Sequence, residues 1–90
     1  MGNMSVKIKL MPSSVETNLE EIKEKSKKIL EKNGGKNVRF EEEPIAFGLK
    51  AIIAFFIWSE EKELESIEKN LEEIENVNSL QVLDIRKTVG

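Results

Sequence analysis

Residues 41–58 read EEEPIAFGLKAIIAFFIW, three glutamates followed by a short turn and a long apolar segment. Pro44 has a fixed φ and Gly48 permits a positive φ, so the two residues predict a tight turn between them. The segments on either side, 37–43 and 48–58, are typical of strands, and together they predict a hairpin. Phe47 lies at its tip, where an aromatic side chain is expected on a loop, although it could also fold back to cap the core.

A strand and a helix precede this hairpin. Residues 4–11 alternate apolar and polar side chains, which is the period of a half-buried strand. Asn18, with Glu21 three residues later, can form a capping box at the start of a helix over 18–33. Gly34-Gly35 predicts the end of that helix. Because no strand precedes the NGGK sequence here and no Ser or Thr follows its lysine, we interpret it as a helix stop and not as a phosphate loop.

A second helix and a last strand follow the hairpin. Ser59 is expected to open the helix, whose apolar residues recur at intervals of three and four, at Leu64, Ile67, Leu71 and Ile74. A short loop is expected around 76–79. In the last strand the apolar spacing changes from two to three between Val82 and Ile85, which predicts a bulge at Leu83-Asp84.

The order β-α-β-β-α-β predicts an α+β fold, a ferredoxin-like sandwich over residues 1–90 as a single domain. Four strands form an antiparallel sheet in the order 4-1-3-2, with both helices on one face. The hairpin turn and the C-terminus then lie at opposite edges, roughly 27 Å apart for strands of eight residues. Both faces of the strand at 48–58 are apolar, so the sequence does not decide which face packs on the helices.

Composition excludes most chemistry. The chain has neither cysteine nor histidine, which removes thiol nucleophiles, the usual zinc ligands and the commonest general base. We therefore expect no enzymatic activity, no catalytic residues, no metal and no cofactor. The longest apolar run, at 51–58, is far shorter than a membrane span of about 20 residues. A cytoplasmic protein without membrane contact is expected.

Charge is distributed unevenly along the chain. Residues 1–40 carry nine Lys or Arg against five Glu, whereas 41–90 carry five against twelve acidic residues, and the net charge is -3. This polarity favours either simple solvation of two amphipathic helices or the steering of a charged partner. The strand at 48–58 lacks the aromatic pattern of RNA-recognition modules, so direct nucleic-acid binding is not expected.

The turn Pro44-Ile45-Ala46-Phe47-Gly48, preceded by VKIKLMPSSVE and followed by an acidic helix and LQVLDIRK, resembles the translation elongation factor 1-beta family in its short archaeal form. The resemblance covers nearly the whole chain, and the turn is its most specific part. It implies a guanine nucleotide exchange factor domain with the ferredoxin-like fold. The implied partner is elongation factor 1-alpha, in its GDP-bound and nucleotide-free forms, which such a factor reloads with GTP so that it can carry aminoacyl-tRNA to the ribosome.

The resemblance also implies two contact regions. In the family the Phe of the turn inserts into a pocket of the second domain of the GTPase, which assigns partner binding to Pro44, Ile45, Phe47 and Gly48. Eukaryotic members place a lysine next to the C-terminus, where it competes with Mg²⁺. This chain has no cation there. Arg86 or Lys87 could supply the charge instead, or both could be ordinary solvated charges at the end of a strand.

Two other classes of function stay open. The first is a ferredoxin-like RNA-binding or ribosome-associated module, which salt-sensitive RNA binding without GDP release would favour. The second is a regulatory domain that binds a small molecule and dimerises through the uncovered face of its sheet. For the exchange factor itself we expect a monomer.

Overall fold

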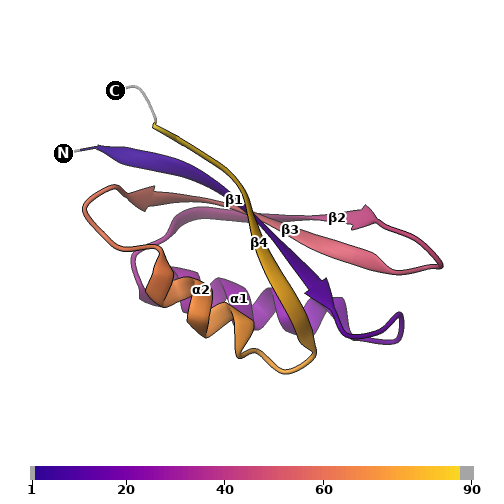
Figure 1. The fold of residues 1–90 in the computed structure, drawn as a ribbon. Coiled ribbons are helices and arrows are strands. Elements are labelled where there is room, and N and C mark those ends of the chain that lie inside the picture. The colour runs from indigo at the N-terminus through magenta and orange to yellow at the C-terminus, as the bar shows by residue number, and fades with distance from the viewer. Residues whose placement is uncertain (1, 88–90) are drawn as a thin grey trace.

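The computed structural model describes residues 2–87 and has the predicted order of elements. These are β1 (Asn3–Pro12), α1 (Leu19–Lys32), β2 (Lys36–Pro44), β3 (Lys50–Ser59), α2 (Glu65–Glu72) and β4 (Val77–Lys87). All strand pairs are antiparallel and the order is β2-β3-β1-β4, which is the predicted 4-1-3-2 order counted from the other edge. Both helices lie on the same side of the sheet (Figure 1). The ferredoxin-like fold is confirmed.

Hydrogen bonds at both ends of α1 satisfy backbone groups that have no partner within the helix. The Asn18 side chain accepts a hydrogen bond from the Glu21 amide at 3.3 Å, although the Glu21 carboxylate pairs with Lys25 and so completes no capping box. At the other end Gly34 has φ +100°, and the Gly35 amide donates to the Leu30 carbonyl at 2.7 Å. This is a Schellman stop, which confirms the interpretation of NGGK.

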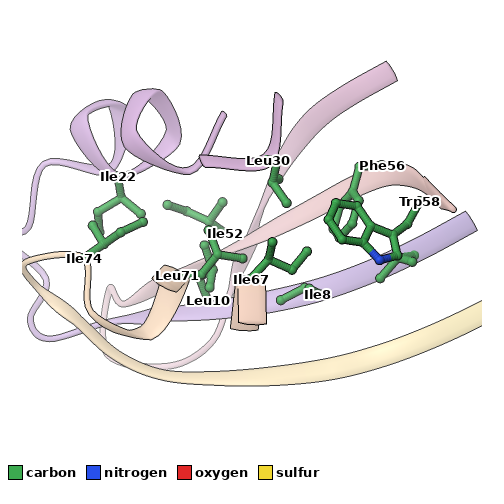
Figure 2. Close-up of a cluster of buried hydrophobic side chains, with 11 residues drawn as sticks. Ile8, Leu10, Ile22, Leu30, Ile52, Phe56, Trp58, Ile67, Leu71 and Ile74 are labelled. Carbon is green, nitrogen blue, oxygen red and sulfur yellow. The ribbon is translucent and has the colours of Figure 1, made fainter. Parts of the chain in front are cut away.

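The core lies between the helices and one face of the sheet. Ile52, Phe56 and Trp58 of β3 point toward the helices, which settles which face of this strand is covered (Figure 2). Trp58 is only 2% exposed and meets Phe56 edge-on, with ring centroids 6.1 Å apart. The other buried residues of the cluster come from β1, from both helices and from the turn after α2: Val6, Ile8, Leu10, Ile22, Leu30, Ile67, Leu71 and Ile74.

The prediction that Ser59 opens the second helix is wrong. Ser59 still belongs to β3, where it pairs with Asn3 of β1, and α2 begins six residues later at Glu65. The Ser59 hydroxyl accepts from the Glu61 amide at 3.2 Å and its carbonyl from the Lys62 amide at 3.1 Å. Serine forms turns as readily as helix caps, and pairing with β1 selects the turn here.

The loop expected around 76–79 is also wrong, because β4 begins at Val77. The chain reverses earlier, in a turn over 73–76, where Asn76 adopts φ +72° and its carbonyl accepts from the Ser13 amide at 2.9 Å. The predicted bulge in β4 is confirmed. Asp84 pairs with Lys7 and Val82 pairs with Ile8, which leaves Leu83 as the extra residue.

The length of the strands sets the distance between the two ends of the molecule. The chain is elongated, with extents of 42 × 21 × 18 Å. In Figure 1 the start of β1 and the end of β4 lie at one end of the molecule, and the β2–β3 turn lies at the other. Strand β3 has ten residues, which at about 3.3 Å each span roughly 33 Å. The expected 27 Å was too short because the strands are longer than eight residues.

Candidate functional site

The turn between β2 and β3 is tightly hydrogen-bonded. The Ile45 amide donates to the Leu49 carbonyl at 2.8 Å, and the Leu49 amide donates back to the Ala46 carbonyl at 2.9 Å. Phe47 and Gly48 occupy the two central positions with φ +53° and +81°. Positive φ at both positions is the pattern of a type I′ hairpin turn, which normally takes Asn, Asp or Gly. The sequence predicted the freedom of Gly48 but not the conformation of Phe47.

The Phe47 side chain is fully exposed, so it does not cap the core of its own chain. A left-handed backbone at a non-glycine residue costs about 1–3 kcal/mol, and such residues gather at functional sites. The exposed ring returns none of this energy through burial in the monomer. A strained, exposed aromatic on a stiff turn is therefore well placed for a partner.

Other exposed apolar side chains lie at the same end of the molecule. Ile45 is 40% exposed, and Val15, in the loop after β1, is 60% exposed. Val15 lies beside the turn, because its Cγ1 would be 3.9 Å from a Cβ placed on Gly48. The sequence prediction missed Val15. Its only signal was an apolar residue within a run of turn-forming residues.

A charge network connects the base of the turn to α1. The Lys23 ammonium lies 2.8 Å from the Glu42 carboxylate, and Lys50 lies 3.9 Å from the same carboxylate. The hydrogen bond from Lys23 lowers the pKa of Glu42, and the same bond raises the pKa of Lys23 above its usual value. The network therefore ties β2 to α1 close to the turn.

Arg86 and Lys87 lie at the opposite end, on the last described residues of β4. Arg86 pairs in the sheet with Ser5 and Lys87 with Met4. The Arg86 guanidinium donates to the Asp84 carboxylate at 2.7 Å, which partly neutralises its charge. Within residues 2–87, no ion pair involves Lys87. Of the two candidate cations, Lys87 is the one that makes no ion pair among the described residues.

On the open face of the sheet, two cationic side chains lie over the only aromatic ring that β3 presents among the described residues. Phe55 of β3 has Arg39 stacked at 4.6 Å and Lys7 at 5.6 Å from its ring centroid. Glu41 and Glu43 lie beside it around a hollow of about 320 Å³. A base-stacking platform needs a free ring in a basic groove, so this arrangement does not favour the RNA-binding alternative.

Among residues 2–87 there is neither a candidate metal site nor a membrane-spanning helix. No cluster of three or more acidic side chains is arranged to hold a metal ion within residues 2–87. Over the same residues, neither helix has the length and apolar character needed to cross a membrane.

A family model and individual relatives point to the same protein family. The model of the EF-1 guanine nucleotide exchange domain family matches residues 5–88. The elongation factor 1-beta of Methanosarcina barkeri is 41% identical over 86 residues, covering 94% of this chain and 97% of the relative. That of Methanocaldococcus jannaschii is 42% identical over 87 residues, covering 94% and 97%. The family match over residues 5–88 spans the turn, the charge network and β4.

Proposed function

The chain belongs to the EF-1 guanine nucleotide exchange domain family and promotes guanine nucleotide exchange on elongation factor 1-alpha, and from this premise we propose how its two ends divide that work. One end anchors the factor to the GTPase, and the other weakens the hold of the GTPase on Mg²⁺ and nucleotide. The exposed Phe47 carries the proposal, because it gives the first end an anchor that the fold itself does not use.

Exchange of this kind requires differential binding and no bond chemistry. A factor that binds the nucleotide-free GTPase more tightly than the GDP-bound form weakens GDP by the same factor, because the two equilibria are linked. Reversing a 99:1 preference takes a differential of about 5.5 kcal/mol. The chain therefore binds both the GDP-bound and the nucleotide-free form, and it favours the second.

At the anchoring end, the Phe47 ring enters an apolar pocket of the GTPase. Its turn is held by two backbone hydrogen bonds of 2.8 and 2.9 Å, so little conformational freedom is left to lose on binding. Pro44 and Gly48 contribute by setting the shape of the turn, and Ile45 adds apolar surface next to the ring. All four are assigned to partner binding.

At the opposite end, Lys87 brings a positive charge toward the bound Mg²⁺ and phosphates. A cation there competes electrostatically with the metal and opposes its retention. Arg86 is the weaker contributor because its guanidinium already pairs with Asp84 at 2.7 Å. The roughly 33 Å between the two ends, from strand length, permits both contacts at once.

We further propose that residues 1–90 act as one domain and as a monomer, in the cytoplasm, without direct contact with nucleic acid or membrane. The net charge of -3 supports the lack of contact with nucleic acid and membrane, because it gives no general attraction to polyanions. The cations stacked on Phe55 support it as well, because they occupy the ring that a base would use.

The proposal is tested by the rate at which elongation factor 1-alpha releases labelled GDP, with and without the protein. We expect catalytic amounts to accelerate release, and RNA binding to be absent at both low and high salt. Salt-sensitive RNA binding without acceleration of GDP release would favour an RNA-binding module instead.

A further inference from the structure

We infer that the loop after β1 and the β2–β3 turn form a second anchoring site for elongation factor 1-alpha, a groove that receives a protruding apolar side chain with a neighbouring carboxylate. The inference rests on the proposed function and adds to it a site that is distinct from the Phe47 ring. The groove has a volume of about 270 Å³, and it is lined by Pro12, Ser14, Val15, Leu19, Glu42, Gly48 and Lys50. Figure 1 shows the loop after β1 and the β2–β3 turn at the same end of the molecule.

The size of the groove indicates what it holds. Pockets for small molecules occupy about 300–1,000 Å³, so 270 Å³ suits one side chain of a protein partner better than a free ligand. Gly48 lines the groove with backbone alone, and a Cβ at this position would lie in ordinary van der Waals contact with Val15, 3.9 Å away.

The Val15 wall is held in a fixed position although it is exposed. The Ser14 amide donates to the Thr17 hydroxyl at 3.2 Å, and the Glu16 amide donates to the Ser14 hydroxyl at 3.3 Å. The Ser13 amide is bonded to the Asn76 carbonyl at 2.9 Å, which fastens the loop to the start of β4. An apolar side chain that is 60% exposed on a braced loop is preorganised for contact.

The charges around the groove favour a carboxylate beside the apolar side chain. Glu42 directs its short contact, 2.8 Å, to Lys23, whereas Lys50 reaches the same carboxylate only at 3.9 Å. The Lys50 ammonium has three donors and its side chain is half exposed, so it can pair with an incoming carboxylate. The groove is also continuous with the Phe47 turn, so one partner surface covers both.

The test compares the affinity of four variants for nucleotide-free elongation factor 1-alpha. Val15→Ser removes the apolar wall. Because full burial of a valine is worth about 1.5–3 kcal/mol and Val15 is 60% exposed in the free protein, binding is expected to weaken about 5- to 20-fold. Leu83→Ser is the matched control, because Leu83 is also exposed, at 39%, but lines the hollow on the open face of the sheet. Its affinity is expected to stay within about twofold of the parent. Phe47→Ala tests the first anchor in the same assay.

Lys50→Met removes the charge but keeps the apolar stem, and it is expected to weaken binding about 2- to 5-fold at low salt and less at high salt. Urea unfolding of each variant reports whether the fold is retained. Parental affinity of Val15→Ser beside weakened Phe47→Ala would overturn the groove and leave the first anchor in place. Equal losses of affinity for Val15→Ser and Leu83→Ser would also overturn the groove. A Lys50→Met variant with the affinity of the parent would overturn the proposed pairing of Lys50 with a carboxylate of the partner. If Phe47→Ala and Val15→Ser both bind normally, both anchors fail, and GDP release by the parent protein then decides the exchange function separately.

Discussion

Replacing Phe47 with alanine separates binding from folding, because the fully exposed ring contributes no burial to the monomer. Alanine keeps a Cβ, so the left-handed backbone at φ +53° remains equally strained. The free energy of unfolding should therefore change by less than about 0.5 kcal/mol.

The expected loss of binding follows from the area of the ring. A phenylalanine buries about 150–250 Å², which at about 25 cal/mol per Å² sets an upper limit of roughly 4–6 kcal/mol. Because alanine retains part of that area, a loss of about 2–4 kcal/mol is expected for an anchor in a pocket, which corresponds to about 30- to 1,000-fold in affinity.

Two measurements test the prediction. Urea unfolding is followed by the fluorescence of Trp58, the single tryptophan, which is buried in the core. Affinity for nucleotide-free elongation factor 1-alpha is measured on the same samples. Phe56→Ala is the matched control, because Phe56 is 2% exposed, and its truncation should cost about 3–5 kcal/mol of stability. A strongly destabilised Phe47→Ala protein whose folded fraction binds normally would refute the anchor role.

Three other changes give separate tests. Arg86→Ala combined with Lys87→Ala should leave the fold intact and slow GDP release, most strongly at high Mg²⁺; superimposed Mg²⁺ titrations of variant and parent would remove both residues from the mechanism. Ser26→Ala should raise stability by about 0.5–1.5 kcal/mol in urea unfolding, because the Ser26 hydroxyl is buried without a hydrogen-bond partner in the described structure and alanine favours helix; a destabilised variant would contradict this. Glu42→Gln should lower stability at neutral pH, and the difference from the parent should shrink as pH falls. The folded pKa of Glu42 is lowered, so its stabilisation is present above the unfolded pKa of about 4.3 and is lost as pH falls through the folded pKa. A difference from the parent that stays constant from pH 7 to pH 3 would argue against the ion pair with Lys23.

The sequence predicted those features that local chemistry controls. Alternation over residues 4–11 depends only on the pleat of a strand, and the end of α1 depends only on the freedom of Gly34. The bulge at Leu83 was visible because the spacing of apolar residues changes within a single strand. Each of these signals is contained in a few neighbouring residues.

Features that depend on distant pairing were not predictable in the same way. Ser59 has the chemistry of a helix cap, but its pairing with Asn3 at the far end of the chain keeps it in a strand. The contact between Lys23 and Glu42 joins residues 19 positions apart, and the sequence contains many equivalent lysines and glutamates. The same limit applies to the candidate site. Phe47 could be found by its position between Pro44 and Gly48, but its own positive φ could not.

The length of β1 and β3 fixes the distance between the two contact regions of the molecule. Both strands have ten residues and lie side by side in the middle of the sheet, paired from Asn3 with Ser59 to Leu10 with Ile52. A sheet lengthens only in steps of two residues if its inner and outer faces are to be preserved, which is about 6.6 Å a step. The gap between the two contact points is therefore quantised, and it cannot be adjusted by small adaptations at either tip. If the domains of the GTPase change their spacing, the factor can contact both of them only in the conformation whose spacing matches the length of its sheet.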